Sequence, residues 1–424
     1  MVALSPVAAW HPNPSRSDPS SLVCPVYDTL SPEEVVRYAS QPFNAAGFVA
    51  RAPEVSVDRF PALAAGRLLR AVDAGAYLQD PSPALYVYGI QYQVPEDIAE
   101  TYAHPDRRPS YLLLGLVGTL TANGPNPPDI ALHERVFEER VQERRRLGAA
   151  TGMQFAPIMA GYSLPDHAVN DLIEAHLGLD RRRLAFAGTK PPLLDVTLDA
   201  VRHRVWRLEE SETAERILGL LASLRVLVLD GHHRISAQLR GVPNGVARHP
   251  LVMLVEARDR GLLLRPWHRL LPHDAVDATN VGKRLRERFP DAVEVPGPRT
   301  PERLVAELIG LRHRRRHGFV ALGRESVWRV EGPIPPDAGA DFELLHRFLE
   351  VDLGLDPRRC AYARSPRRAL EAVDSEGGMA FLLPTTTVEA VERLAFEHHR
   401  VMAQKSTMFL PKVLDGLLFA PWSG

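Results

Sequence analysis

The chain has 424 residues with 51 basic and 52 acidic side chains, a formal net charge of −1. Hydrophobic residues make up 45% of it and charged residues 24%, a balance that excludes a mainly disordered protein. A near-neutral chain is not a basic nucleic-acid coat, so we expect no nucleic-acid partner, while a local phosphate site stays compatible with this charge. The length allows roughly two or three domains.

The cysteine content and the longest apolar stretch bear on the cellular compartment. Cys24 and Cys360 are the two cysteines and cannot form a disulfide framework or a thiolate metal site, which favours a cytoplasmic protein. Residues 1–21 lack the basic and apolar regions of a secretory signal. The longest apolar stretch, near residues 112–120, has about half of the ~20 residues that span a bilayer, so we expect no membrane partner.

The first half of the chain predicts alternating helices and strands after a leader. Residues 1–22 are rich in Pro, Ser and Ala without periodicity and predict a loose leader. Capping signals and periodicity then predict a helix from Ser31, a helix at 58–76, paired strands at 85–92 and 111–120, and helices at 134–147 and 166–177.

The second half continues this alternation. The predicted elements are strands at 193–197, 202–208 and 225–229, a helix at 212–223, a hairpin of 251–256 with 262–266, helices at 277–289, 301–316, 342–353, 366–374 and 387–399, and strands at 319–322, 326–330 and 379–383. This order predicts an α+β fold, with domains at 23–272 and 276–424.

The most specific local pattern is Asp230-Gly-His-His-Arg234, which follows the apolar strand at 225–229 and precedes a helical segment. A strand, a tight glycine turn and a helix N-terminus leave backbone N–H groups unpaired, and these attract phosphate together with the helix dipole. Arg234 is predicted to add a bidentate fork for phosphate oxygens. Asp230 is suited to capping the helix or holding a divalent ion. The structural alternative is a capped surface turn.

His232 and His233 are also candidates for paired metal ligands. Adjacent side chains diverge on most backbones, and the usual zinc spacings are absent. We therefore expect one histidine to donate to a phosphate and the other to pack or to orient its neighbour.

A second group of polar residues stands in Gln404-Lys-Ser-Thr-Met-Phe-Leu-Pro-Lys412. The chain has four lysines, and Lys405 and Lys412 are two of them. Lys405 offers a point charge to a phosphate, while Ser406 and Thr407 can donate to phosphate or bind magnesium. The glycines of a Walker A loop are missing, and a polar turn before a strand is the alternative.

Two carboxylates complete the candidates. Asp28, in Pro25-Val-Tyr-Asp28, is either a metal ligand or a turn former. Glu134, in His133-Glu134, is either a general base or metal ligand, or a first-turn glutamate placed for the helix dipole.

Six motifs follow one another along the chain: Pro25-Val-Tyr-Asp-Thr-Leu-Ser-Pro-Glu-Glu34, Ala84-Leu-Tyr-Val-Tyr88, His133-Glu-Arg135, Asp230-Gly-His-His-Arg234, Trp267-His-Arg-Leu270 and Lys405-Ser-Thr-Met-Phe-Leu-Pro-Lys412. In this order they resemble a prokaryotic family catalogued as domain of unknown function 1015, over about residues 22–420. The chain departs from the family pattern at Gln154, Ile235 and Met408 and so resembles a divergent member. Where relatives often have Asn, this chain has Gln154, which predicts a changed substrate pocket.

Through Gly-His-His-Arg the family is distantly similar to the ParB and sulfiredoxin superfamily, which includes free-serine kinases. The resemblance implies a mixed-sheet nucleotide-binding core with flanking α+β segments. It implies an ATP phosphate site at residues 230–234, joined by Lys405, Ser406, Thr407 and Lys412. It further implies Mg²⁺ shared by the phosphates and nearby carboxylates, for which Asp28 and Asp230 are the candidates. By the same analogy a glutamate activates the substrate hydroxyl; the family motif does not identify this residue, and our candidate is Glu134, with His232 and His233 as further catalytic candidates.

The function that we expect is an ATP- and magnesium-dependent kinase acting on a hydroxyl of a small polar acceptor, such as a serine-like amino acid. The alternative is a ParB-like nucleotide-binding switch without small-molecule turnover. A structural protein without activity is the third possibility, and a homodimer stays open. If the motifs form one site, Arg234 and Lys405 should line one cleft together with Asp28.

Overall fold

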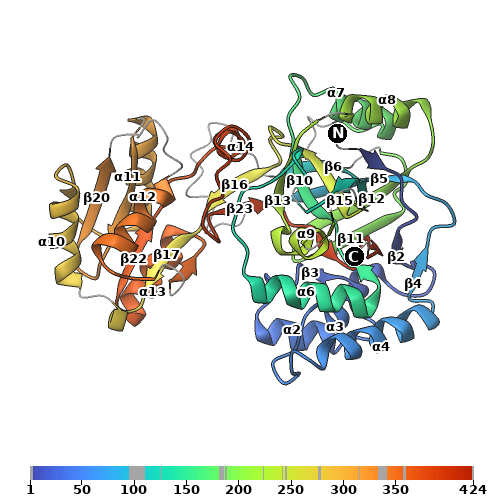
Figure 1. Cartoon of the computed structure of the whole chain (residues 1–424), viewed down its shortest axis with the longest axis horizontal. Coiled ribbons are helices and arrows are strands. Elements are labelled where there is room, and N and C mark those ends of the chain that lie inside the picture. The colour runs from blue at the N-terminus through green and yellow to red at the C-terminus, as the bar shows by residue number, and fades with distance from the viewer. Residues whose placement is uncertain are drawn as a thin grey trace.

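The computed structural model describes residues 3–94, 110–125, 127–180, 186, 189–222, 224–240, 242–243, 246–275, 278–314, 316–332, 341–356 and 360–422. These residues form two lobes that lie side by side (Figure 1). Both chain ends lie in the larger lobe (Figure 1). None of the helices in the described ranges is long and apolar enough to cross a lipid bilayer.

A nine-stranded mixed sheet forms the centre of the larger lobe. Its order is β11-β12-β5-β6-β15-β10-β13-β8, and β1 pairs with β6. The pairs β10–β15 and β13–β8 are parallel, and the other described pairs are antiparallel. The strands are β1 Leu4–Ser5, β5 Leu85–Tyr92, β6 Tyr111–Leu120, β8 Ile130–Leu132, β10 Ile158–Tyr162, β11 Leu194–Leu198, β12 Val201–Leu208, β13 Val226–Asp230 and β15 Leu251–Glu256.

Strand β13 is apolar from Val226 to Leu229 because both of its faces are covered. Val226 and Val228 belong to the hydrophobic cluster that contains α7 and α8. Leu227 and Leu229 belong to the opposite cluster, which contains residues from the C-terminal end of the chain. Because alternate residues are buried on opposite faces, the strand is held within the sheet, and Asp230 lies at its carboxyl end. The helices of this lobe are α6 Glu138–Thr151, α7 Ala168–Leu177, α8 Glu212–Leu221 and α9 His232–Leu239, and α6 begins four residues later than predicted.

The N-terminal segment packs against the larger lobe. The prediction of a loose leader at 1–22 is wrong for its described part, because β1 pairs with β6 and β2 pairs with β4. Strands of two or three residues are too short to give a periodic signal. The predicted capping box at Ser31 is confirmed. The elements are β2 Trp10–Pro12, α1 Pro19–Leu22, β3 Cys24–Pro25, α2 Pro32–Ala39, α3 Ala46–Val49, α4 Phe60–Asp73 and β4 Tyr77–Gln79.

The smaller lobe is built on a six-stranded antiparallel sheet of order β18-β20-β19-β22-β17-β21. Its elements are β17 His268–Leu271, η2 His273–Ala275, α10 Ala278–Arg288, β18 Val293–Glu294, α11 Pro301–His313, β19 His317–Leu322, β20 Val327–Gly332, α12 Asp341–Arg347, η3 Phe348–Asp352, β21 Ala361–Ala363, α13 Pro366–Glu376 and β22 Met379–Leu382. Helix α14, Val388–Phe396, lies between the lobes (Figure 1).

A two-stranded ribbon joins the lobes. Strand β16, Leu263–Pro266, pairs with β23, Thr407–Leu410, as the chain leaves the larger lobe and later returns to it. The predicted hairpin of 251–256 with 262–266 is therefore wrong: β15 lies between β6 and β10, so both of its edges are already paired.

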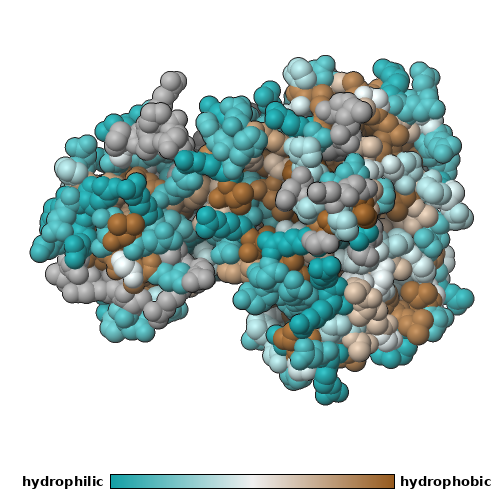
Figure 2. All heavy atoms as spheres, in the orientation of Figure 1, coloured by the Kyte–Doolittle hydropathy of each residue, from teal (hydrophilic) through white to brown (hydrophobic). Residues whose placement is uncertain are grey.

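The end of the chain packs in the larger lobe. There β24, Leu414–Asp415, pairs with β3, and β25, Ala420–Pro421, pairs with β9, Met153–Gln154. The segment predicted as a second domain, 276–424, is thus divided between the lobes. One further short pair joins β7, Ala122–Asn123, to β14, Ala247–Arg248. On the face drawn in Figure 2 the surface is mainly hydrophilic, with hydrophobic residues in small groups.

Candidate functional site

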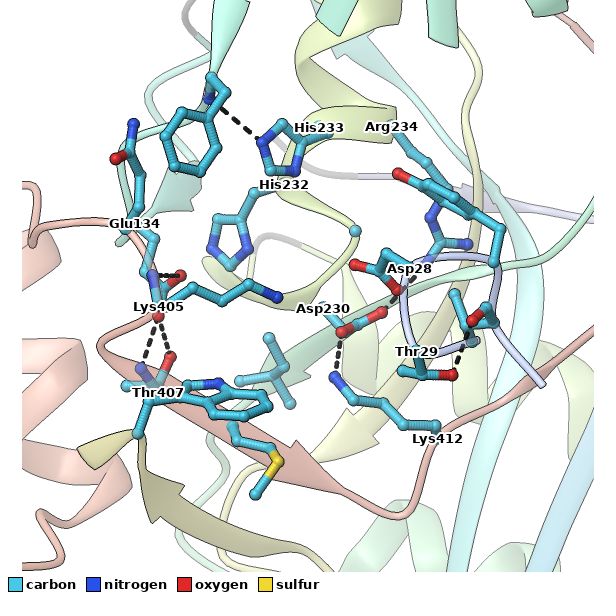
Figure 3. Close-up of a pocket in the computed structure, with 18 of the residues that line it drawn as sticks. Asp28, Thr29, Glu134, Asp230, His232, His233, Arg234, Lys405, Thr407 and Lys412 are labelled. Atoms are coloured by element: carbon cyan, nitrogen blue, oxygen red, sulfur yellow. Dashed lines mark hydrogen bonds and ion pairs between the residues drawn. The ribbon is translucent and has the colours of Figure 1, made fainter. Parts of the chain in front are cut away.

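A cavity of about 370 Å³ lies where the ends of β8 and β13 meet the β16–β23 ribbon. Its walls come from residues within 26–29, 134–137, 229–234 and 404–412, together with Trp267 and Arg364. The prediction that Asp28, Arg234 and Lys405 line one cleft is therefore confirmed. Figure 3 shows these segments facing one another across the cavity.

The parallel pairing of β8 with β13 brings two motifs together. Its register sets Val228 opposite Leu132, so His133-Glu134 leaves the sheet at the same edge as Leu229-Asp230. Carboxyl ends of neighbouring parallel strands are the usual place for a binding crevice in mixed α/β sheets. The two motifs are about a hundred residues apart in sequence, so the local sequence pattern cannot predict that β8 pairs with β13.

Gly231 forms the turn between β13 and α9. Its φ of +93° is a left-handed conformation that favours glycine, and the first helical hydrogen bond runs from the Ile235 amide to the Gly231 carbonyl. The amides of His232, His233 and Arg234 have no hydrogen-bond partner among the described residues. The predicted set of unpaired helix N-terminal donors is therefore present at the cavity wall.

Arg234 does not present the predicted free fork to the cavity. It is buried, and its guanidinium donates to the carbonyls of Ala156 and Pro157 at 3.1 and 2.9 Å and to Asp230 at 3.0 Å. A Cβ atom at position 231 would lie 2.9 Å from the guanidinium. Arg234 therefore supports the Gly231 turn from beneath, and three of its N–H donors are used by the protein.

Asp230 is paired with two cations. Its two carboxylate oxygens accept separately from Arg234 and from Lys412. Burial acts to raise the pKa of Asp230, but the charges of Lys412 and Arg234 outweigh this and hold the pKa below its usual range.

An ionised but neutralised carboxylate is a poor metal ligand, whereas Asp28 is exposed at the cavity and carries no ion pair among the described residues. No group of three or more His, Cys, Asp or Glu side chains suited to a metal occurs in the described ranges.

The predicted Lys-Ser-Thr motif forms a turn around the carboxylate of Glu134. Glu134 accepts from the amides of Lys405, Ser406 and Thr407 at 3.2, 3.0 and 2.6 Å, and from the Thr407 hydroxyl at 2.6 Å. The Ser406 hydroxyl donates to the carbonyl of Ala403. Both hydroxyls are therefore already bonded within the protein, although Thr407 lines the cavity.

Lys405 is the member of the motif that points into the cavity. Its backbone φ is +56°, and its ammonium group lies 5.3 Å from the centre of the Trp267 ring, a cation–π contact. The side chain extends toward Asp230 across the cavity (Figure 3). Arg269, fully buried in β17, donates to the carbonyls of Lys405 and Gln404, so residues of both lobes hold this turn.

His133 is a buried residue of the site to which the sequence assigned no role. The Thr407 hydroxyl lies 2.8 Å from His133 Nε2, and His133 Nδ1 lies 3.3 Å from His232 Nε2. These contacts connect Glu134 with His232 through Thr407 and His133. Burial lowers the pKa of His133 to about 3 and also lowers that of His232, so both rings are neutral at neutral pH. The signal in the sequence that could have pointed to His133 is its position directly before Glu134.

His233 has a different environment. Its Nε2 accepts from the Phe137 amide at 3.1 Å, and its ring stacks on that of Phe137. Burial lowers the pKa of His233 to about 4, and a neutral ring whose Nε2 accepts must carry its proton on Nδ1. His233 therefore keeps one N–H donor in the wall of the cavity.

The residues that depart from the family pattern are mainly structural here. Gln154 is buried and bonds to the carbonyls of Ala156 and Leu251, so it holds the segment that receives Arg234. Ile235 is fully buried in the core. Neither lines the cavity, whereas Met408 does. Gln154 therefore lies outside this cavity and is connected to it through the segment that receives Arg234.

Asp415 holds the segment that carries Asp28. It is buried and accepts from the amide of Tyr27 at 2.8 Å. Burial raises the pKa of Asp415 to about 6, although the charge of Arg234 acts to lower it. A carboxyl whose pKa is raised in the folded state contributes stability below pH ~4 that is lost as the pH rises to ~6.

Asp415→Asn is therefore expected to gain stability over the wild type between pH 4 and pH 7, by about 3 kcal/mol. An asparagine side chain can still accept from the Tyr27 amide but cannot ionise. The measurement is urea unfolding at pH 4, 5, 6 and 7. Asp58→Asn, at an exposed carboxylate, is the matched control and should follow the wild type. Parallel curves for Asp415→Asn and wild type would contradict the prediction.

Several solved structures are similar to this chain. A free serine kinase in complex with AMP matches with 14% identity and a TM-score of 0.38, over 69% of this chain and 87% of that chain. A conserved hypothetical protein from Pyrococcus furiosus matches with 13% identity and a TM-score of 0.37, over 70% and 93%. C-terminally truncated SbnI from Staphylococcus aureus matches with 10% identity and a TM-score of 0.36, over 70% and 85%. Among the curated proteins nothing matches.

The family comparison covers most of the chain. A family model described as "Protein of unknown function (DUF1015)" matches residues 4–332. The match includes the segments that contribute Asp28, Glu134 and residues 230–234 to the cavity, while Arg364 and the Lys405 turn lie beyond it. The chain therefore belongs to the DUF1015 family.

Proposed function

We propose that the cavity binds a nucleoside triphosphate and that the protein transfers the terminal phosphoryl group to a hydroxyl of a small polar acceptor. The observation that carries this proposal is that one cavity is lined by Lys405 and by residues 232–234 at the α9 N-terminus, whose amides have no partner among the described residues. Phosphoryl transfer depends mainly on positioning and charge neutralisation, and these groups supply both to a polyphosphate.

The charges of the cavity favour a polyphosphate. Five cationic side chains and three carboxylates are found among its described lining residues, and His232 and His233 are neutral. The amides of residues 232–234 would bind phosphate oxygens, and Lys405 would neutralise charge from the opposite wall. Magnesium, when bound with the nucleotide, would neutralise further phosphate charge, and Asp28 is the exposed carboxylate that can hold it. Asp230 would hold Lys412 in place instead.

Glu134 is proposed as the general base. Its Oε1 atom receives three donors, whereas Oε2 receives one amide at 3.2 Å and keeps an accepting position. Burial raises the pKa of Glu134, while hydrogen bonds from Thr407 act to lower it. A carboxylate with a raised pKa is a better proton acceptor for a substrate hydroxyl. The contacts through Thr407 and His133 to His232 hold the carboxylate in one orientation.

A nucleotide-dependent switch is the second candidate function. One observation favours it: the turn at Lys405 is held by Glu134 from the larger lobe and by Arg269 from the smaller lobe. A ligand bound to Lys405 would then affect the hydrogen bonds by which this turn connects the two lobes. The two functions are separated by measuring ADP formation with and without small hydroxylated acceptors. A kinase forms ADP in step with acceptor phosphorylation, whereas a switch binds nucleotide without acceptor-dependent turnover.

Lys405→Ala is expected to weaken ATP binding by about 10- to 100-fold, because a charged hydrogen bond to phosphate contributes roughly 1.5–3 kcal/mol. Isothermal titration calorimetry with a non-hydrolysable ATP analogue measures this directly. Lys283→Ala is the control, since Lys283 is exposed on α10 and pairs with Glu287 far from the cavity. Equal affinity for the ATP analogue in the Lys405 variant and in wild type would show that Lys405 does not bind the nucleotide.

A further inference from the structure

We infer that the acceptor carries an anionic group, a carboxylate or a phosphate, which is bound by Arg364 of the smaller lobe together with Arg135 of the larger lobe. This inference rests on the proposed phosphoryl transfer and specifies its substrate class. Both arginines line the cavity. The acceptor would therefore bridge the two lobes.

Arg364 is placed by the pairing of β17 with β21. The register sets His268 opposite Ala363 at the end of the pairing, and Trp267 and Arg364 are the residues next to them in sequence. The ring of Trp267 receives the ammonium group of Lys405 at 5.3 Å. Arg364, Trp267 and Lys405 all line the cavity.

The two arginines have no carboxylate to neutralise them. Arg135 and Arg364 are exposed, and neither forms an ion pair with a described residue. Guanidinium groups in this state bind carboxylate or phosphate through paired N–H donors.

The carboxylates of the cavity are otherwise engaged or distant. Asp230 pairs with Arg234 and Lys412, and Glu134 accepts from the amides of the Lys405 turn. Asp28 lies across the cavity from Glu134 (Figure 3). An anion supplied by the substrate would complete the charge balance at this wall.

The position of Arg135 also suits the chemistry. Arg135 and Glu134 both line the cavity, so an acceptor anchored at Arg135 shares this cavity with the proposed base. The amides of residues 232–234 remain available to the nucleotide on another wall. Arg364 lies beyond residues 4–332, the part matched by the family model, so this contact comes from a segment that the family model does not cover.

The test compares acceptors that differ in one group. Glycerate and glycerol 3-phosphate are paired with glycerol, and serine is paired with ethanolamine, with ADP formation and ³¹P NMR as readouts. We expect turnover with at least one acceptor that carries the anionic group and at least tenfold lower kcat/KM with the partner that lacks it. Arg364→Gln should raise the KM of the anionic acceptor by about tenfold and leave the KM of ATP unchanged. Arg364→Lys should restore part of the loss.

Arg368→Gln is the matched control, because Arg368 is exposed on α13 and pairs with Glu371. Preference for glycerate or for glycerol 3-phosphate identifies the anion as carboxylate or phosphate. Equal rates with the acceptors that lack the anionic group, no turnover with any anionic member while ATP still binds, or an unchanged KM in Arg364→Gln would overturn the inference and leave nucleotide binding standing. Failure of the chain to bind ATP would instead overturn the proposed function.

Discussion

Glu134→Gln is expected to lower kcat by about 10²- to 10⁴-fold, the usual contribution of a general base, while ATP affinity changes little. Glutamine has nearly the same shape, and its carbonyl oxygen can still accept from the amides of Ser406 and Thr407. Its amide group cannot accept a proton, and it would also face the Lys405 amide, which donates to Oε2 in the wild type. The chemical step is therefore affected far more than nucleotide binding.

The measurement separates these two effects. Steady-state kinetics with a saturating acceptor gives kcat, and calorimetry gives the affinity for a non-hydrolysable nucleotide. Glu139→Gln is the matched control, because Glu139 is exposed in the first turn of α6. An unchanged kcat in Glu134→Gln would show that the carboxylate only shapes the Lys405 turn. A large loss of both kcat and nucleotide affinity would point to collapse of that turn.

Arg234→Ala is expected to lower the free energy of unfolding by about 3–5 kcal/mol, since it breaks a buried ion pair and removes two further hydrogen bonds. The carbonyls of Ala156 and Pro157 lose their donor, and Asp230 keeps only Lys412. The Gly231 turn also loses the guanidinium that packs against it. We expect weaker ATP binding as a consequence of this disturbed turn.

Urea unfolding at pH 7 tests this expectation. Arg240→Ala is the control at the opposite end of α9, where Arg240 is partly exposed and pairs with Glu138; its loss should stay below about 1 kcal/mol. A variant at Arg234 with wild-type stability but no ATP binding would show that the guanidinium serves the ligand directly. That outcome would support the free fork expected from sequence and contradict the role of Arg234 as a support of the Gly231 turn.

Local chemistry made several features of the site predictable. The apolar run at 226–229 predicts a strand covered on both faces, and Gly231 followed by a helical segment predicts a tight turn with unpaired amides. The scarcity of lysine drew attention to Lys405, which does point into the cavity. Each of these properties depends on neighbours within a few residues, so a short window of sequence contains the relevant information.

The direction of the polar side chains could not be predicted in the same way. The sequence suggested that Arg234, Ser406 and Thr407 face a phosphate, yet both hydroxyls and three N–H donors of Arg234 are used by protein acceptors. A buried donor must be satisfied, but the available acceptor depends on which distant segment packs beside it. The acceptor of Thr407 is Glu134, far away along the chain.

The sequence by itself determined the local elements, the family and the residue types from which a phosphate site can be built. Only the tertiary structure decided which of them meet. The parallel register of β8 with β13 brings Glu134 to Asp230, and the ribbon of β16 with β23 carries Lys405 back to the same cavity. Arg364 joins them through the pairing of β17 with β21. Strand register and the balance of buried charges arise from contacts between distant segments, and local periodicity does not encode these contacts.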